Sequence, residues 1–394
     1  MSLPQRGHTT GFVPDERDAD GKLVRSHDDR TPYQLARYGK GLKGINVWYG
    51  AEYTTTLVCD FAMSAGADNP APIDKRGWCI FERRLSSVRK DRRCCLSLSL
   101  LPRGDGALDW TDVFRACQSD RLAPLAPDGF EALMREGMAR EQAAAGTGIR
   151  FTNGKDATDV CIPQYREAFL RLMSMGGLLG FEYCAWADAD VAQLAAALRH
   201  AHAAGATTQA YSLRLGDNRL TDAALPPLVE AIEAGAMPCV NRLALEGNEL
   251  TDAGLATLRP LLVGRLSGLV QLTFGSRLTA DGARVLAALV AEGHLAQLED
   301  LTLSDNRELG DAGTAAIAEA MATGRLTRLE ELDLTGTGMG DAGAAALGAA
   351  LGGAPALKKL VVGANAFGAA AAEGLKAACK ARGVAAMANY LDAL

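Results

Sequence analysis

The second half of the chain repeats one pattern six times, and this repetition constrains the fold more than any other feature. Each unit opens with a short alternating apolar stretch. Its first leucine recurs at spacings of 30, 29, 29, 31 and 28 residues, at Leu213, Leu243, Leu272, Leu301, Leu332 and Leu360. Such alternation places the apolar side chains on one side of a short strand. A unit this short cannot bury that side alone, so the pattern predicts a solenoid of stacked units.

Polar residues at fixed places in the repeat indicate how each unit turns. An asparagine follows the strand in four units, where a buried side-chain amide is expected to satisfy backbone groups of the turn. A Thr-Asp-Ala or Gly-Asp-Ala sequence comes next, and its threonine or aspartate suits a helix N-cap. The alanine-rich stretch that follows has helical spacing. Each unit is therefore predicted to be a strand, a turn and a helix.

These repeats resemble the long leucine-rich repeats of the ribonuclease-inhibitor type. The resemblance implies an α/β horseshoe whose strands line a concave face. It extends over residues 178–394, because Leu179 and Phe181 lie 34 residues before Leu213 and Leu215. We expect about six repeats, preceded by a degenerate unit that caps the array.

The strand positions between the leucines predict which residues line the concave face. We expect this face to be small, polar and acidic towards its middle, and to lack Trp and Tyr anchors. It is interpreted either as a solvated sheet face or as a docking face for a protein with a basic patch. The candidate binding residues are Arg214, Arg242, Glu246, Asp300, Glu331 and Asp333.

The first half of the chain has a different organisation. Residues 1–32 are polar and charged with little periodicity, which predicts a disordered arm. Residues 33–177 alternate strand-like stretches, such as TTTLVC and RCCLSLSLL, with helix-like ones, such as WCIFERRLSSVRK and DGFEALMREGMAREQAA. Such alternation predicts a small α/β domain with a largely parallel sheet, of the flavodoxin type.

A basic segment lies within this first half. Between Lys75 and Arg93 there are eight basic and two acidic residues. We favour a solvated helix face as the explanation. The alternatives are a contact with an acidic protein, anionic lipid or nucleic acid, or self-association between this patch and the acidic repeat face. The patch consists of Arg83, Arg84, Lys90, Arg92 and Arg93.

The segment Trp78-Cys79-Ile80-Phe81-Glu82 resembles the Trp-Cys-x-x-Glu segment of Toll/interleukin-receptor (TIR) domains. In the NAD-cleaving members of that family this glutamate is catalytic, so the resemblance implies Glu82 as catalyst and NAD as substrate. A wider pattern, RGWC-x-FE followed by FTNGKD, resembles an uncharacterised domain of algae and other protists, which brings no known activity. From the residues alone, Trp78 and Phe81 pack a helix onto a sheet, and Glu82 pairs with a neighbouring arginine.

Other sequence signals narrow the function further. The nine cysteines include no C-x-x-C pair, so no metal site is predicted. The sequence contains no P-loop. The net charge is −6, and residues 178–394 hold 16 Lys and Arg against 24 Asp and Glu, which gives no support for nucleic-acid binding there. The stretch after Met1 lacks an apolar core, so we expect neither a signal nor a transit peptide and an intracellular location.

Together these patterns predict a non-enzymatic protein-interaction scaffold or adaptor that requires no cofactor, either on its own or as a subunit of a larger assembly. The alternative is a TIR-like NAD hydrolase with the repeats as a sensing module. The two hypotheses differ in the role of Glu82, which is a structural residue in the first and the catalytic residue in the second.

Overall fold

The computed structural model describes most of the chain from residue 71 onward and parts of the chain before it. Within the predicted arm it describes only β1 (Glu16–Arg17) and β2 (Leu23–Arg25), an antiparallel pair that the sequence did not predict. The rest of residues 1–32, and the start of the predicted domain at residue 33, lie outside the described residues. The described ranges are 16–17, 23–25, 47, 49–51, 54–60, 71–101, 109–118, 121–151, 153–275 and 277–387.

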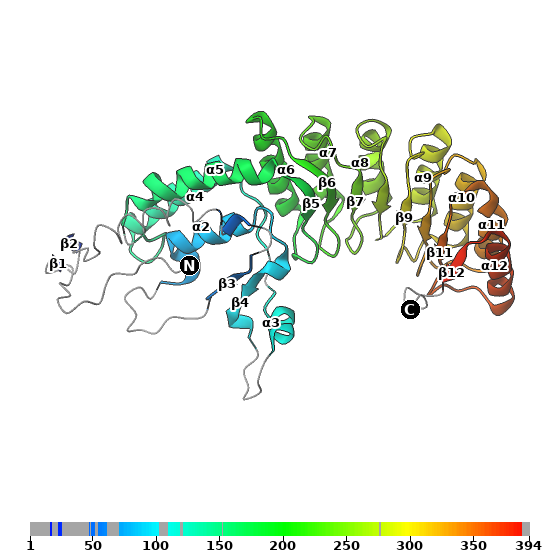
Figure 1. Ribbon diagram of the computed structural model, residues 1–394, viewed down its shortest axis with the longest axis horizontal. Helices are drawn as coiled ribbons and strands as arrows, with labels where there is room; N and C mark the ends of the chain where they lie inside the picture. Colours follow the sequence, from blue (N-terminus) through cyan, green and yellow to red (C-terminus); the bar gives the residue numbers. More distant parts are fainter. Residues whose placement is uncertain are drawn as a thin grey trace.

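The repeats form one eight-stranded parallel sheet, covered on its outer side by a row of helices (Figure 1). The strands, in spatial and chain order, are β5 (Gly176–Gly180), β6 (Gln209–Arg214), β7 (Arg242–Ala244), β8 (Gln271–Thr273), β9 (Asp300–Thr302), β10 (Glu331–Asp333), β11 (Lys359–Val361) and β12 (Ala385–Met387). The helices are α6 (Asp188–Ala203), α7 (Leu225–Glu233), α8 (Asp252–Val263), α9 (Ala280–Glu292), α10 (Gly310–Ala322), α11 (Asp341–Ala350) and α12 (Ala369–Arg382). The six predicted leucines pair in register, so the α/β solenoid is confirmed.

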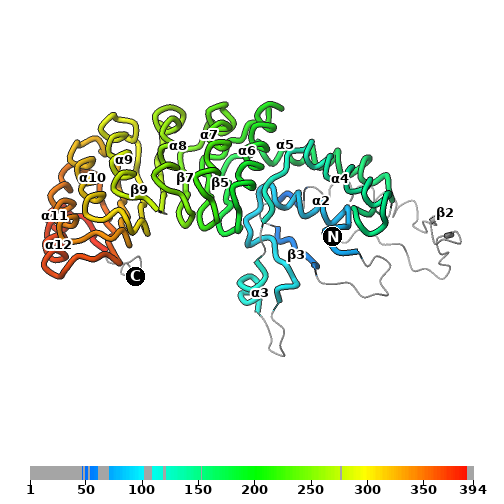
Figure 2. The backbone as a smooth tube through the Cα atoms, turned by 180° about the vertical axis from the view of Figure 1, so that it is seen from behind, coloured from blue at the N-terminus to red at the C-terminus, as the bar shows by residue number. Residues whose placement is uncertain are grey.

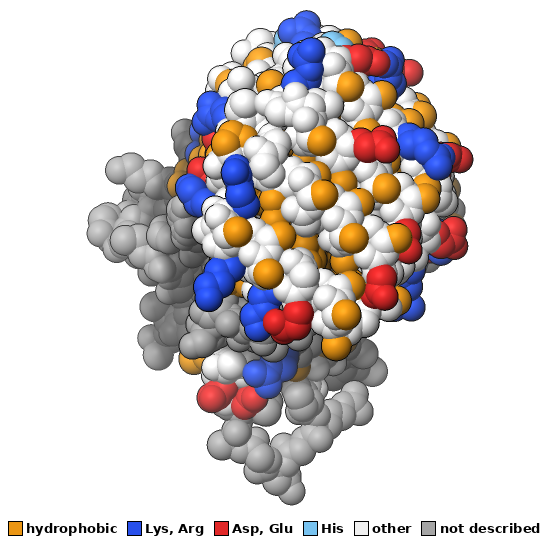
Figure 3. Space-filling view, turned by 90° about the vertical axis from the view of Figure 1, so that its right-hand side faces the viewer, with side chains coloured by type: hydrophobic (Ala, Val, Ile, Leu, Met, Phe, Trp, Pro, Cys, Tyr) orange, Lys and Arg blue, Asp and Glu red, His pale blue; other side chains and the backbone are white. Residues whose placement is uncertain are grey.

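Both ends of the array differ from its middle. The expected degenerate first unit forms β5 and α6. At the other end the sheet has a strand that was not predicted, because β12 carries Ala386 in register with Leu360 and therefore lacks the leucine signal. Seen from this end, hydrophobic side chains gather near the middle of the face and charged side chains are spread around them (Figure 3).

The buried asparagines satisfy the turns as predicted. The side-chain amide of Asn248 donates to three backbone carbonyls of its own repeat and the preceding one, at 3.0–3.1 Å. Its Oδ1 accepts the backbone N–H of Leu220 at 3.1 Å. A buried amide that satisfies several backbone groups holds one turn against the next. The same contacts recur at Asn218, Asn306 and Asn365.

The threonine and aspartate that recur from repeat to repeat make a second contact that the sequence did not predict. Thr251 caps α8 by accepting the N–H of Ala253, as expected of an N-cap residue. The aspartate of the preceding repeat, Asp222, then accepts both the N–H and the hydroxyl of Thr251, at 2.9 and 2.6 Å. Asp188 with Thr221 and Asp252 with Thr279 repeat this contact. Adjacent helices are thus joined at their N-terminal ends.

The segment before the repeats contains a smaller sheet than predicted. Its β3 (Thr56–Val58) and β4 (Cys95–Ser97) are parallel, as expected, but they form a sheet of two strands. The helix between them, α2 (Gly77–Ser86), ends before Lys90, so the predicted basic helix is shorter than expected. The remaining helices are α3 (Trp110–Ala116), α4 (Pro127–Ala143) and α5 (Ile162–Met173).

The hydrophobic core runs without interruption from this segment into the repeats. Phe130 of α4 stacks on Tyr165 of α5 with ring centroids 4.0 Å apart, and the same buried cluster includes Val191 of α6. Two opposite views show α4 and α5 leading into the row of repeat helices (Figures 1 and 2). The expected boundary between residues 177 and 178 falls inside β5.

Two buried arginines close the outer edge of the repeat sheet at β5. Successive residues of a strand direct their backbone N–H and C=O groups to opposite edges. The N–H groups of Phe181 and Tyr183 donate to carbonyls on the β6 side. The carbonyls of Gly176, Leu178 and Gly180 therefore face outward. Arg89 donates to the first two at 2.6 and 3.2 Å, and Arg121 donates to the third. An edge that would otherwise be open to pairing with another chain is thereby covered.

We predict that Arg121→Met lowers the free energy of unfolding by about 2–4 kcal/mol, since charge-assisted hydrogen bonds from a fully buried group would be lost. Arg121 also lies over the Phe181 ring, 4.2 Å from its centroid. Urea unfolding would measure the change. The control is Arg171→Met on the exposed side of α5. Equal stability of the two variants would contradict the assigned role of Arg121.

Candidate binding groove beside the first repeats

The inner face of the repeat sheet is more closed than predicted. The position between the two leucines of each repeat was expected to be exposed, but Asp333 is 1% exposed and Val361 is fully buried. Strands about 4.8 Å apart leave little room between the longer side chains of the flanking rows. The Asp333 carboxylate accepts the backbone N–H of Thr335 at 2.8 Å and so serves the turn. Asp333 is therefore corrected from a candidate binding residue to a buried structural one.

The acidic residues of the later repeats are half-buried and partly compensated. Glu331 forms an ion pair with Lys359 of the next strand at 2.7 Å. Burial raises the pKa of Asp300, and the negative charge of Glu331 adds to this effect. The middle of the face thus presents less free negative charge than the sequence suggested.

A groove lies at the opposite end of this face, where the first repeats meet the segment before them. It consists of two hollows of about 480 and 390 Å³ that share Leu178 and Arg214. We call it the Tyr–Arg groove, defined by Arg92, Arg93, Tyr183, Tyr211, Arg214 and Arg242. The first two come from the turn after α2, and the others from the first repeats. The larger hollow therefore depends on both parts of the chain, whereas the smaller one is lined by the repeats alone.

Two tyrosines are exposed in this groove, which corrects the prediction of a face without aromatic anchors. Tyr183 is 57% and Tyr211 is 48% exposed. Tyr211 has the same parity as the buried Leu213, so simple alternation would place it inside. However, Gly177 pairs with Ala210 and the next residue pairs with Ser212, so β6 carries an extra residue at Tyr211. Such a bulge turns a side chain to the other face.

The arginines of the groove are held by neighbours but stay accessible. Arg214 lies 3.4 Å from Glu182 and keeps 44% of its side chain exposed. Arg93 pairs with Asp91 at 3.0 Å and is 72% exposed. Arg92 donates to Gln118 at 2.8 Å and lies over the Tyr183 ring, 5.5 Å from its centroid. With Arg242, four guanidinium groups face two carboxylates, which leaves the groove positive.

A buried carboxylate lies next to the groove. Glu246 packs against Gly216, where an added Cβ would come within 2.5 Å of its Oε1. Its Oε2 is buried without a hydrogen-bond partner among the described residues. Burial raises the pKa of Glu246, and the charges of Asp217 and Glu182 raise it further. Of the predicted binding residues, the structure brings Arg214, Arg242 and Glu246 together at one end, apart from Asp300 and Glu331.

The predicted basic patch is divided among three environments. Lys90 is 1% exposed and donates to the hydroxyls of Thr54 and Thr56 at 2.8 Å. Arg92 and Arg93 line the Tyr–Arg groove, whereas Arg83 and Arg84 line a different cavity beside α2. The solvated helix face is therefore wrong as a description of the whole patch, because α2 ends at Ser86 and the chain then turns.

Glu82 faces a small cavity of about 180 Å³ together with Tyr49, Cys79 and Arg76. Burial raises the pKa of Glu82 to about 7, while a hydrogen bond from Tyr49 opposes this shift. Burial also raises the pKa of Tyr49, and the charge of Glu82 adds to it. No ion pair of Glu82 with an arginine is found among the described residues, so the expected surface pair is replaced by a contact with Tyr49.

The described part of the chain lacks two further features. No group of three or more His, Cys, Asp or Glu side chains is placed to hold a metal ion there. None of the helices in these ranges has the length and apolar character needed to cross a bilayer.

Strand–turn–helix units on one parallel sheet, joined by buried asparagines, define the class of α/β repeat solenoids. The family model described as "Leucine Rich repeat" matches residues 326–348. Over 184 residues the chain is 32% identical to leucine-rich repeat-containing protein 73 of rat and of human. The matched residues make up 46% of this chain. The chain thus contains repeats similar to those of leucine-rich repeat proteins.

The chain spans about half, 53%, of the length of these curated relatives. Among solved structures, an internalin from Listeria monocytogenes is 16% identical with a TM-score of 0.31, covering 56% of this chain and 49% of that one. A protein from Bacteroides fragilis is 15% identical with a TM-score of 0.35, covering 65% of this chain and 80% of that one.

We predict that the burial of Glu82 makes stability fall as pH rises from about 4.5 to about 7. In this window the unfolded carboxyl is ionised, whereas the folded one still holds its proton. The free energy of unfolding should fall by up to about 3 kcal/mol relative to Glu82→Gln, at about 1.4 kcal/mol per pKa unit. Urea unfolding at several pH values would measure it, with Glu167→Gln on the exposed side of α5 as control. Parallel profiles for wild type and Glu82→Gln would refute it.

Proposed function

We propose that this protein is a non-enzymatic scaffold or adaptor that binds a partner protein through the Tyr–Arg groove. The observation that carries the proposal is the presence of two exposed tyrosines and four guanidinium groups along two adjoining hollows. Tyrosine and arginine are the residues that contribute most binding energy at protein interfaces. Leucine-rich repeat proteins generally bind proteins, and a solenoid supplies an extended surface for this.

The charge of the groove favours an acidic partner. Its arginines outnumber its carboxylates, so an extended segment with Asp or Glu side chains would be complementary. An apolar or aromatic side chain of that segment would lie against Tyr183 and Tyr211.

Self-association between the basic segment and the acidic repeat face has less support. Lys90 and Asp333 are buried, and Glu331 is already paired with Lys359. A second copy would have to bring its remaining acidic residues to Arg92 and Arg93. Light scattering over a range of protein concentrations would reveal such a contact as a rise in mass.

We expect the substitutions Tyr211→Ala and Arg214→Glu each to weaken partner binding about thirtyfold, because residues at the centre of an interface contribute most of its binding energy. Partners that bind through the groove should therefore no longer be captured by these variants. Partners captured by the tagged full chain would be identified by mass spectrometry, and their acidic segments would then be titrated as labelled peptides. The matched control is Arg259→Glu, a charge reversal on α8 at 46% exposure, against 44% for Arg214. Equal loss of partners with Arg259→Glu, or none with Arg214→Glu, would refute the groove as the binding site.

A second candidate function is NAD cleavage, as the TIR resemblance implies. The observation in its favour is a buried carboxyl of Glu82 with a pKa near 7 beside a cavity. The cavity of about 180 Å³ is smaller than the roughly 300–1,000 Å³ of small-molecule sites, which favours the scaffold.

We expect purified protein to leave NAD intact, with no difference between wild type and Glu82→Ala by chromatography of the nucleotide. Consumption of NAD by wild type alone would replace the scaffold proposal with the enzyme. It would also make Glu82 the catalytic residue.

A further inference from the structure

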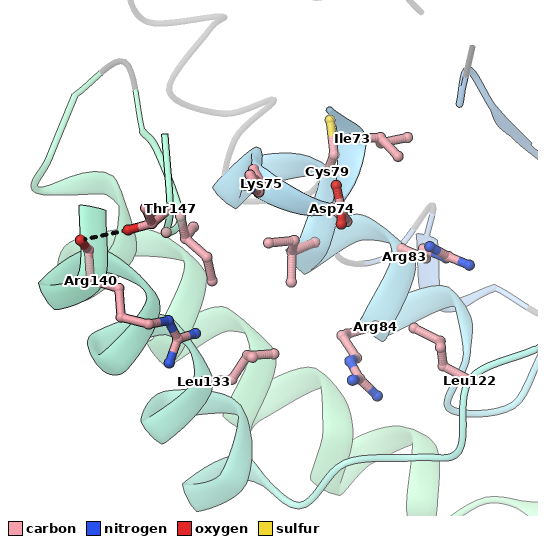
Figure 4. Close-up of a pocket in the computed structure, with 13 residues that line it drawn as sticks. Ile73, Asp74, Lys75, Cys79, Arg83, Arg84, Leu122, Leu133, Arg140 and Thr147 are labelled. Carbon is pink, nitrogen blue, oxygen red and sulfur yellow. Dashed lines mark hydrogen bonds between the residues drawn. The ribbon is translucent and has the colours of Figure 1, made fainter. Parts of the chain in front are cut away.

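A second cavity, separate from the Tyr–Arg groove, lies between α2 and α4. It has a volume of about 300 Å³. Its third side is the segment 147–149 that follows α4. Figure 4 shows Arg84 extending from α2 and Arg140 from α4 into the space between these helices, with Leu133 between them. We call this cavity the helix pocket.

The wall formed by segment 147–149 is fixed against α4. The N–H of Ile149 donates to the carbonyl of Gly137 at 2.9 Å. A Cβ on Gly148 would come within 2.0 Å of that same carbonyl, so only glycine allows this approach. The carboxylate of Glu141 accepts the N–H groups of Gly146 and Gly148 at 2.8 and 3.1 Å. The helix pocket is thus formed before any ligand arrives, which reduces the entropy lost on binding.

The charged groups of the helix pocket are mostly cations with little compensation. Arg84 makes no ion pair among the described residues, and its guanidinium donates to one carbonyl, that of Ala123, at a long 3.4 Å. Arg140 lies 3.9 Å from Glu136, and both of these side chains are more than half exposed. Lys75 and Arg83 add two further positive charges, and the carboxylate of Asp74 is exposed at the rim.

Arg84 carries an electrostatic cost in this position. Burial is the largest effect on its pKa and lowers it; Tyr165 opposes this shift, the neighbouring Arg83 adds to it, and Asp190 opposes it least. A half-buried guanidinium without a counter-charge is unfavourable unless an anion compensates it. A bound anion would supply this compensation for Arg84 and Arg140 at once.

The rest of the lining is aliphatic, with Ile80, Leu133 and Ile149 among its residues. An anion with an apolar body fits such a site better than a bare ion does. The volume is at the low end of the roughly 300–1,000 Å³ typical of small-molecule sites, so the ligand is small. Planar guanidinium forks match phosphate oxygens in pairs, which favours phosphate over a single carboxylate.

We propose that the helix pocket binds a small phosphate monoester that carries an aromatic ring, with its phosphate between Arg84 and Arg140 and the face of its ring against Leu133 and Ile149. Neither the repeats nor the Tyr–Arg groove takes part, so the proposal is independent of the scaffold function.

The test is calorimetric titration of the full chain with AMP and with phenyl phosphate at low salt. Both should bind more tightly than inorganic phosphate, and adenosine should bind least. Arg140→Gln should weaken AMP binding at least about tenfold, as expected for loss of a charged hydrogen bond. The matched control is Arg135→Gln, on the same helix and paired with Glu131 outside the helix pocket, which should bind like wild type.

Arg84→Lys provides a second variant that keeps the positive charge and removes the planar guanidinium, so its affinity for AMP should lie between those of wild type and Arg140→Gln.

Four results would overturn the proposal: no binding of either ester, equal weakening by Arg135→Gln and Arg140→Gln, adenosine binding as tightly as AMP, or tighter binding of a phosphotyrosine peptide than of both esters. Thermal unfolding of each variant would confirm that it is folded. If Arg84→Lys does not fold, the comparison of Arg140 with Arg135 still decides.

Discussion

The outer edge of β5 is the constraint on which the arrangement of the whole chain depends. A parallel sheet of short strands has two edges, and each exposes carbonyls that must find donors. At β5 these donors are the guanidinium groups of Arg89 and Arg121, both buried and both belonging to the segment before the repeats. Because the caps come from another part of the chain, the first repeat cannot reach its observed environment without that segment. The continuous hydrophobic core has the same consequence.

This junction also creates the two features that bear on function. The turn that carries Arg89 to the edge of β5 brings Arg92 and Arg93 next to Arg214, so the Tyr–Arg groove forms where the edge is closed. On the other side of α2, Arg83 and Arg84 are left facing α4. One basic segment thus supplies a structural cap, part of a groove and part of a cavity. The direction of each side chain is set by where α2 ends.

The repeats themselves show how far a pattern in the sequence reaches. The leucine spacing predicted the strands and their register, and the asparagines predicted how the turns are satisfied, because both depend on contacts that recur in every unit. The aspartate–threonine contacts between repeats were not predicted, since an aspartate near a helix start has a local explanation as a cap. Tyr211 was missed because a one-residue bulge reverses the alternation from which faces are counted.

By itself, the sequence determined the solenoid, its α/β class and the approximate position of its first unit, because periodic spacing and local turn chemistry carry this information. Only the tertiary structure decided which charged residues are available. Lys90, Arg121 and Asp333 are buried, while Arg214 stays exposed, and no local pattern distinguishes them. The pKa of Glu82 is likewise set by the tertiary structure, because burial raises it to about 7 and a hydrogen bond from Tyr49, far from it in the sequence, opposes this shift. The physical reason is that desolvation and hydrogen-bond partners are set by neighbours in space, which the sequence order does not specify.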